Sequence, residues 1–423
     1  MSDSLPARPA SRTSPWLVVG LLMPVALLNY LDRQMLASMQ GSVMDSIPSL
    51  GLAENREELW GFMLGQFKWV YAAFSLVGGY LADRFSRRLT IAASLFVWSA
   101  VTWWTGQVET YDQLLRARSL MGISEAFYIP AALALVADHH AGSTRSRAVG
   151  LHQMAIYLGV IAGGFGGYVA AAPGLGWRFA FTACGVVGLA YALPLVALLR
   201  DAPGKGRQGG AAAVSPLAAG RELFSNGSFL LLVLYFTLPA IAGWVVRDWM
   251  PAILKKEFGI GEGQAGVAAT VYWQLAAIVG AAAGGWLADR RMRHGPRGRI
   301  HVSAIGMCLI VPATFGVGNA GTLGMAVAFL VLFGIGWGFF DCNNMPILSQ
   351  IVRPELRATG YGVMNLVSIG CGGLADWGFG ILRDRGVPLN LIFGAFAATA
   401  ILSVVIVSLI RPNPTLSGIA DHR

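Results

Sequence analysis

Charged residues are scarce in this sequence. Only 13% of the 423 residues are Asp, Glu, Lys or Arg, whereas 55% are hydrophobic and the mean hydropathy is +0.58. A soluble protein of this length needs far more charge to cover its surface. The composition therefore excludes a soluble fold and predicts a membrane protein that crosses the bilayer many times.

Cysteines are also few, and motifs for metal binding or nucleophilic catalysis are missing. The four cysteines lie in apolar runs at spacings that fit no zinc or redox site, so we expect no disulfide, metal or other cofactor. They are Cys184, Cys308, Cys342 and Cys371. His139 and His140 are adjacent but have no further ligand at a metal-binding spacing. The sequence therefore argues against an enzyme.

The basic residues that are present follow a topological pattern. The net charge is +9, and most Lys and Arg lie in short loops on one side of the apolar runs, from Arg8 to the run between Arg290 and Arg299. Membrane topology explains this pattern better than nucleic-acid binding, because basic loops stay in the cytoplasm. We therefore predict no nucleic-acid partner, a monomer in the inner membrane of a bacterium-like cell, and both termini in the cytoplasm.

The apolar runs predict twelve spans, each close to the roughly 20 residues that cross a bilayer. The first is too long for a signal-peptide core and is expected to be retained. In the first half the spans are 16–39, 60–82, 89–107, 113–136, 147–170 and 177–199. In the second half they are 228–250, 264–288, 299–318, 322–345, 356–381 and 389–410. The stretch 201–225, rich in Gly and Ala, is the predicted cytoplasmic linker.

Two short motifs occur once in each half. The segment from Gly78 to Arg88, which reads GGYLADRFSRR, returns as GGWLADR from Gly284 to Arg290. The words RAVG and RATG, beginning at Arg147 and Arg357, form a second pair. A stop-transfer loop with positive charge could explain one copy, but two copies half a chain apart indicate duplicated halves.

The first motif resembles the loop G-x-x-x-D-R-x-G-R-R of the major facilitator superfamily. Asp83, Arg84 and Arg88 match it, and Ser86 replaces its glycine. The resemblance implies an all-α membrane protein of two pseudo-symmetric six-helix bundles, residues 1–200 and 226–423, which rock to give alternating access. A channel is less compatible with such paired halves. The resemblance also implies that the loop residues control the conformation. These are Asp83, Arg84, Arg88, Asp289 and Arg290.

Ionisable residues inside spans point to function, because each is costly in hydrocarbon unless it faces water or a partner. The first half concentrates them. They are Asp32, Arg33, Lys68, Arg118, Glu125 and His152, with Gln153 beside the last. Five of them, Asp32 to Glu125, carry a net charge of one positive when both acids are ionised, which favours an anion. Arginine also matches a carboxylate well. Two alternatives stay open: Arg33 or Arg118 could form a packing ion pair, and Lys68 could extend outward.

Two further motifs narrow the resemblance. The words from Asn29 to Arg33 (NYLDR) and from Arg118 to Ala126 (RSLMGISEA) are similar to the anion:cation symporter branch, and the spinster branch has similar words. The first branch implies that Tyr30, Arg33 and Arg118 contact the anion, and that Asp32 and Glu125 carry protons. Lys68 matches neither branch. The glycines of 159–167 resemble a motif of drug and proton antiporters, but they lack its proline and favour a packing surface instead.

The second half has fewer charges inside its spans. We expect the amides of Asn343 and Asn365 to bind hydroxyl groups of the ligand, together with His152 and Gln153 of the first half. Asp376 is expected to pair with a neighbour such as Arg383, and the role of Asp341 stays open. These observations predict a secondary transporter that carries a small organic anion, such as a sugar acid or other carboxylate, together with a proton. The alternatives are a spinster-like lysolipid transporter and a proton-coupled drug exporter.

Overall fold

The computed structural model describes residues 14–140, 144–202, 216–413 and 416 of the chain. Within its helices, the side chains of residues 76, 78–84, 146, 216 and 217 are not described. All regular elements of the described residues are helices, which confirms the all-α prediction.

The helices follow the predicted spans closely. In the first half they are α1 (Pro15–Ser38), α2 (Gln40–Ser46), α3 (Pro48–Gly51), α4 (Arg56–Arg84), α5 (Arg87–Thr105), α6 (Tyr111–Glu125), α7 (Tyr128–His139), α8 (Arg145–Gly164), α9 (Gly166–Ala171) and α10 (Gly176–Leu198). In the second half they are α11 (Pro216–Ser225), α12 (Gly227–Phe258), α13 (Glu262–Met292), α14 (Gly298–Gly318), α15 (Leu323–Ile351), η2 (Pro354–Leu356), α16 (Arg357–Asp384) and α17 (Leu389–Leu409).

Local sequence sets several helix boundaries. Thr110 begins α6 by accepting a hydrogen bond from the backbone N–H of Gln113 at 3.3 Å, and Asn226 begins α12 in the same way. Gly259 ends α12 in the left-handed region, with φ of 62°, where a side chain would be strained. The predicted span 113–136 is divided between α6 and α7, and the span 147–170 between α8 and α9.

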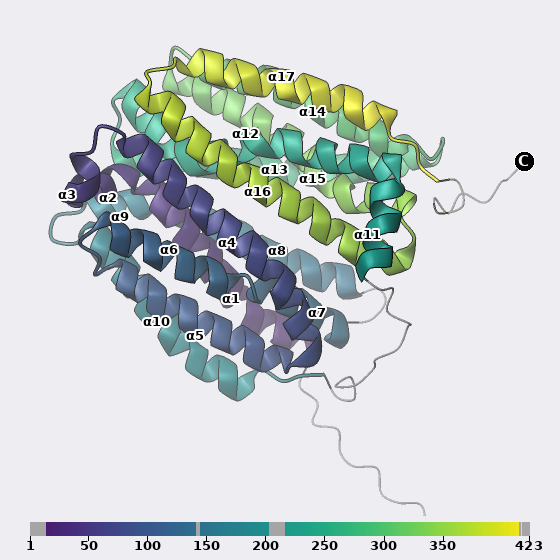
Figure 1. The fold of residues 1–423 in the computed structure, drawn as a ribbon, viewed down its shortest axis with the longest axis horizontal. Coiled ribbons are helices and arrows are strands. Elements are labelled where there is room, and N and C mark those ends of the chain that lie inside the picture. The colour runs from purple at the N-terminus through teal and green to yellow at the C-terminus, as the bar shows by residue number, and fades with distance from the viewer. Residues whose placement is uncertain (1–13, 141–143, 203–215, 414–415, 417–423) are drawn as a thin grey trace, which may run out of the picture.

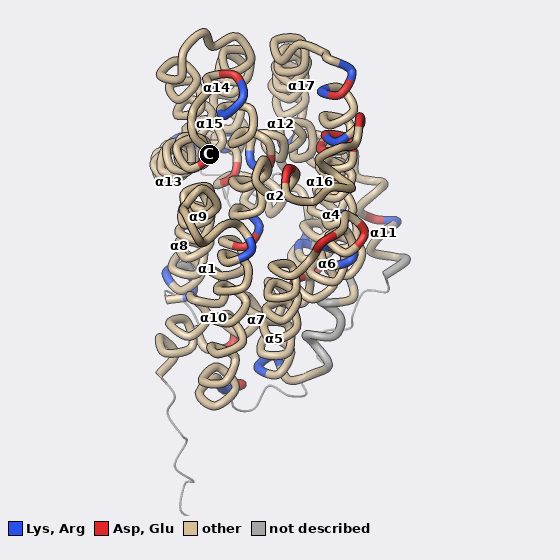
Figure 2. The backbone as a smooth tube through the Cα atoms, turned by 90° about the vertical axis from the view of Figure 1, so that its left-hand side faces the viewer, with Lys and Arg blue, Asp and Glu red and all other residues tan. Residues whose placement is uncertain are grey.

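The helices form two bundles (Figure 1). Figure 2 looks from the side where α2 and α3 lie, and shows α12 to α17 above α1, α5, α7 and α10. We call this side the α2 end and the opposite side the linker end. The stretch predicted as the linker contains α11, whose Ala219 and Leu223 are buried in the core that includes α12.

Nine helical stretches in the described residues are long and apolar enough to cross a membrane. The predicted spans of α5 and α16 are not among these nine, and neither is that of α4, part of which lies outside the described side chains. Two of these, α4 and α16, lie side by side between the bundles (Figure 1), where protein rather than lipid covers their polar residues. The polar residues of α4 and α16 therefore fit the position of these two helices between the halves.

Glycines let the two halves approach closely. A Cβ atom at Gly61 of α4 would lie 2.3 Å from the carbonyl oxygen of Asp376, and one at Gly65 would lie 2.7 Å from that of Gly373. At a second contact, a Cβ atom at Gly164 would lie 2.0 Å from Oγ1 of Thr270 in α13. Side chains at these glycines would separate the halves. The glycines of 159–167 therefore form a packing surface, as the sequence indicates.

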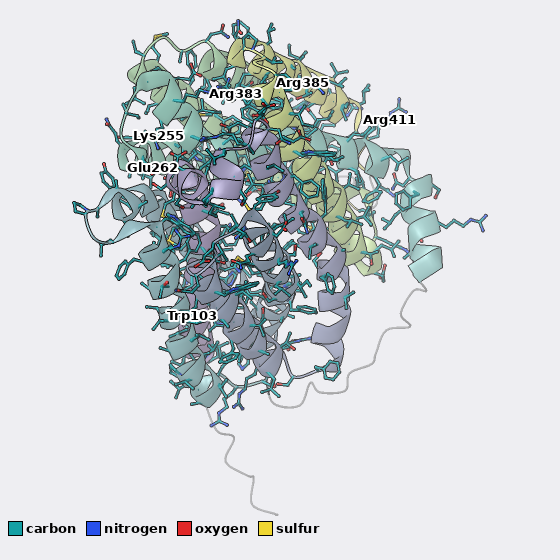
Figure 3. All side chains as sticks on the ribbon, turned by 60° about the vertical axis from the view of Figure 1, so that its left-hand side comes forward. Trp103, Lys255, Glu262, Arg383, Arg385 and Arg411 are labelled. Carbon is teal, nitrogen blue, oxygen red and sulfur yellow. The ribbon has the colours of Figure 1, made fainter. Side chains whose placement is uncertain are left out.

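Carboxylates hold the halves together at the α2 end. Glu262 of α13 accepts hydrogen bonds from the backbone N–H of Ser42 at 3.0 Å and from the Ser42 hydroxyl. Asp384 of α16 accepts from the backbone N–H groups of Glu57 at 3.2 Å and Glu58 at 2.7 Å. Each carboxylate thus binds the first turn of a helix in the other half, where free N–H groups favour negative charge. Figure 3 shows Glu262 beside Lys255, whose Nζ lies 3.5 Å from Oε1 of Glu262.

Candidate functional site

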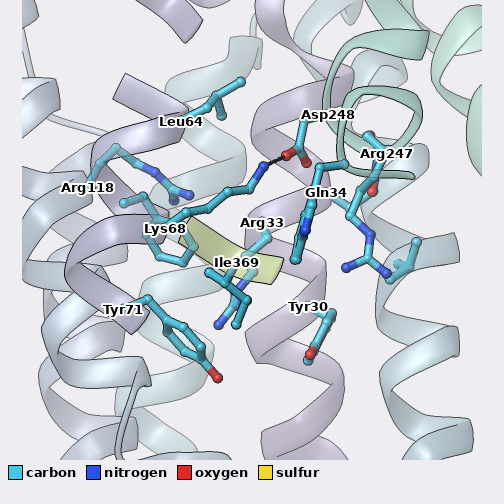
Figure 4. A pocket seen from close by; sticks show the side chains of 13 residues that line it. Tyr30, Arg33, Gln34, Leu64, Lys68, Tyr71, Arg118, Arg247, Asp248 and Ile369 are labelled. Carbon is cyan, nitrogen blue, oxygen red and sulfur yellow. Dashed lines mark hydrogen bonds and ion pairs between the residues drawn. The ribbon is translucent and has the colours of Figure 1, made fainter. Parts of the chain in front are cut away.

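A cavity of about 40 Å³ lies between the two halves. Its walls come from α1, α4, α6 and α8 of the first half and from α12 and α16 of the second. The lining residues are Tyr30, Arg33, Gln34, Leu64, Phe67, Lys68, Tyr71, Arg118, Val160, Trp244, Arg247, Asp248 and Ile369 (Figure 4). A cavity of this volume holds about three water molecules. An organic ligand therefore requires the halves to move apart.

Arg33 forms a buried ion pair. Its Nη2 lies 2.6 Å from Oε2 of Glu125, and its Nε donates to the same oxygen at 2.7 Å. The guanidinium also lies 4.7 Å from the ring centre of Tyr71 and 4.9 Å from that of Phe67. Glu125 is fully buried behind Arg33 and does not line the cavity. The ion pair that was left open as an alternative for Arg33 is therefore present, although the arginine also faces the cavity.

Arg118 is a buried cation whose contacts include no carboxylate. It is 2% exposed, and among the described residues no acidic oxygen lies within 4.0 Å of it. Its Nη1 donates to Sδ of Met121 at 2.9 Å, its guanidinium lies 4.5 Å from the ring centre of Phe67, and its Nε has no hydrogen-bond partner. Its hydrogen-bonding capacity toward the cavity is therefore largely unused.

Arg247 of α12 is a second arginine of the cavity, and it comes from the second half. It lies 5.5 Å from the ring centre of Trp244 and 5.8 Å from that of Tyr30, and the ion pairs within the described part of the chain do not include it. Figure 4 shows its side chain beside those of Gln34 and Tyr30. Two guanidinium groups, one from each half, thus line the cavity without a contacting acid.

Lys68 is bound to two carboxylates of the second half. Its Nζ lies 2.5 Å from Oδ2 of Asp248 on α12 and also contacts Oδ2 of Asp376 on α16. The lysine is 4% exposed, which excludes the alternative that it extends outward. The expectation that Asp376 pairs with Arg383 is wrong. Arg383 lies 3.4 Å from Glu257 instead, because Asp376 faces α4 across the junction of the halves.

Arg247 and Asp248 are not among the residues that we predict from the sequence. The pair lies inside the predicted span 228–250, in the word WVVRDW from Trp244 to Trp249. The rule that charges inside spans mark function applies to them as much as to Arg118. Applied to this span, that rule would have identified both residues as candidate site residues.

Four of the predicted ligand contacts do not line the cavity in this conformation. His152 shares a hydrogen bond of 2.9 Å with the Tyr128 hydroxyl, and Gln153 is its neighbour on α8. The amides of Asn343 and Asn365 donate to backbone carbonyl groups of their own helices, at 2.9 and 3.2 Å. Their roles stay predictions.

Asp32, predicted to carry a proton, is 1% exposed and accepts a hydrogen bond of 2.7 Å from the hydroxyl of Thr102. Its other oxygen, Oδ1, is buried and has no hydrogen-bond partner. It lies outside the cavity lining. Asp32 and Glu125 are thus both buried behind cations, which suits a proton carrier without testing that role.

The predicted loop residues whose side chains are described, namely Arg88, Asp289 and Arg290, make contacts within their own halves. Asp83 and Arg84 lie outside the described side chains. Arg88 donates to the carbonyl group of Val196. Oδ1 of Asp289 lies 3.6 Å from Arg299, and Arg290 lies 5.6 Å from the ring centre of Trp286. Control of the conformation by these residues stays a prediction.

The amino-acid sequence of this chain is similar to those of known proteins. Residues 22–375 match the family model described as Major Facilitator Superfamily. The chain is 28% identical over 371 residues to an MFS-type efflux pump of Mycolicibacterium smegmatis, covering 87% of this chain and 84% of the pump. It is 25% identical over 412 residues to a probable L-galactonate transporter of Escherichia coli, covering 91% of this chain and 87% of that protein.

The fold is also that of solved structures. A bacterial homologue of the human lysosomal transporter Spinster, in an inward-facing and occupied conformation, superposes with a TM-score of 0.79 at 20% sequence identity. The match covers 95% of this chain and 97% of that structure.

Proposed function

This chain belongs to the Major Facilitator Superfamily, and from that premise we propose that it transports a small organic anion together with a proton. The observation that carries the proposal is the pair of cavity arginines, Arg118 and Arg247, which have no acid in contact. An anion in this cavity would face one such guanidinium group from each half. Charge-assisted hydrogen bonds from guanidinium groups to anions are the strong ones.

The charges around the cavity support coupling to protons. Four cations of the lining lie among acids in the lining or close to it. The cations are Arg33, Lys68, Arg118 and Arg247, and the acids are Asp32, Glu125, Asp248 and Asp376, with Asp341 of α15 near enough to Arg247 to interact electrostatically. An anion alone would add one negative charge to this group, whereas an anion and a proton together leave its charge unchanged. Binding of the two is therefore mutually favourable.

We infer that the α2 end faces the outside and that both termini are cytoplasmic, because the basic loops lie at the linker end. The ion pairs and hydrogen bonds at the α2 end then correspond to a carrier closed to the outside. Galactonate, named for one relative, is a sugar acid and falls in the predicted class. The lining also has Phe67, Trp244 and Ile369, so carboxylates with an apolar body belong in the same test.

The proposal is tested by ligand binding and then by transport. Purified protein is screened by thermal shift against sugar acids, aromatic acids and lysophospholipids, each beside a neutral amide or alcohol of similar shape. We expect a carboxylate to raise the melting temperature and its neutral analogue to have little effect. Uptake of that carboxylate into proteoliposomes should then require an inward proton gradient. Stabilisation by neutral drugs or lysolipids alone would favour the alternative transporters and contradict the proposal.

A further inference from the structure

Lys68, Asp248 and Asp376 form a cluster whose net charge is negative when both acids are ionised. One cation and two ionised acids leave one negative charge in a site where Asp376 is fully buried and Asp248 is mostly buried. Oδ1 of Asp376 is also buried and has no hydrogen-bond partner. An uncompensated buried charge is costly, and two carboxylates that share a site do not both stay ionised readily.

The surroundings of the cluster supply cations at longer range. Arg33 of α1, Arg118 of α6 and Arg247 of α12 line the same cavity, as do the tyrosines Tyr30 and Tyr71. Arg33 already contacts Glu125, and the described residues give no contact between Arg118 or Arg247 and either acid of the cluster. These cations therefore reduce the excess negative charge but do not pair with it.

The cluster exists only when the halves meet. Lys68 belongs to α4 of the first half, whereas both acids belong to the second half. Gly61 and Gly65 of α4 pack against the backbone of α16 beside Asp376, so separation of these helices removes Lys68 from the acids and admits water. Water stabilises ionised carboxylates, so opening of the α2 end removes the cost of the excess negative charge that the closed site carries.

We propose that the Asp248 and Asp376 pair, with Lys68, is a proton site that binds one proton as the halves close at the α2 end. This inference rests on the proposed function, because it names a place where the transported proton enters the carrier. It adds a site in the second half to Asp32 and Glu125 of the first. Lys68 then serves closure and proton binding and is not primarily an anion contact.

The test measures closure without any anion. Spin labels are placed on cysteines introduced at the exposed positions Leu52 and Asn390, near the α2 end of each half, in full-length protein whose four native cysteines are replaced. Double electron–electron resonance then gives the closed and open populations between pH 5 and pH 8. Since the closed state holds the extra proton, the ratio of closed to open should fall as pH rises, by at most about tenfold per pH unit.

Two variants and a control test whether the pH dependence of closure comes from this cluster. Asp376→Asn and, independently, Asp248→Asn remove the excess charge. In each variant, the fold-change in the ratio of closed to open populations per pH unit should be at least three times smaller than in the parent. The control Asp112→Asn neutralises an exposed acid on α6 and should keep the parent slope. A pH-independent parent, an unchanged slope in both cluster variants, or loss of slope in the control would each overturn the proposal. Because no ligand is present, these results are separable from failure of the anion screen.

Discussion

Arg118→Gln should weaken anion binding strongly while changing the stability of the empty protein less than Arg33→Gln does. The guanidinium has no carboxylate in contact, and its Nε lacks a hydrogen-bond partner. If the ligand carboxylate accepts two bonds from it, and each bond to a charged group contributes about 1.5–3 kcal/mol, the loss is about 3–6 kcal/mol. At about 1.4 kcal/mol per tenfold, affinity should fall at least about a hundredfold. Asp32 loses only a longer-range interaction with Arg118, so the melting temperature of the ligand-free variant should fall less than that of Arg33→Gln, which breaks an ion pair in contact.

The measurement is calorimetric titration of the carboxylate found in the screen, with melting curves of the ligand-free protein beside it. Arg116→Gln is the matched control, because Arg116 lies on the same helix but is exposed. It should bind like the unmodified protein. Unchanged affinity in Arg118→Gln would refute the anion site, and a large drop in the melting temperature without ligand would show that Arg118 is a structural residue.

Four more variants test other parts of the structure. Arg33→Gln should lower the free energy of unfolding by about 3–5 kcal/mol because it leaves Glu125 buried without its cation, and adding Glu125→Gln should restore much of the loss in denaturation assays. Alone, Glu125→Gln should retain anion binding but abolish its pH dependence and proton-driven accumulation in proteoliposomes, while counterflow continues. Glu262→Gln should weaken the contact at the α2 end and increase the open population measured with the spin labels at positions 52 and 390; a population equal to that of the parent would contradict this. Gly61→Ala should impair transport because its Cβ would meet the backbone of α16, whereas Gly378→Ala, where nothing lies within 4 Å, should be tolerated; equal activity of both in uptake assays would exclude the glycine contact as a requirement.

The fold follows from the sequence in most respects because hydropathy reflects the bilayer directly. All twelve predicted spans correspond to helices, and their bounds differ by a few residues at most ends. The largest difference is at α12, which runs eight residues past the predicted end at Met250. Its extension contains Pro251, which is tolerated inside the helix, and ends at Gly259. Hydropathy alone does not mark such an amphipathic extension beyond the apolar core.

The site follows from the sequence only in part. Arg33, Lys68 and Arg118 line the cavity, as expected from the rule that charges inside spans indicate function. Tyr30, which the family resemblance implied, lines it as well. The partners of Lys68 could not be predicted, because the rotation of α4 and the approach of the two halves decide which acids meet it. Sequence spacing describes neighbours on one helix, whereas this cluster joins three helices from two halves.

The polarity of α4 and α16 has a consequence for biosynthesis. A charged residue at the centre of a helix costs roughly 2.5–3.5 kcal/mol during insertion by the translocon. Lys68 and Asp376 offset each other's cost only when both helices are in the bilayer, yet 308 residues of translation separate them. Asp248 of α12 is the first of its two carboxylate partners to be made, and until then the nascent chain must hold α4 in the membrane through its apolar neighbours. We expect nascent chains that stop before α16 to remain substrates for membrane quality-control proteases, because Lys68 lacks its second carboxylate partner until the eleventh span is inserted.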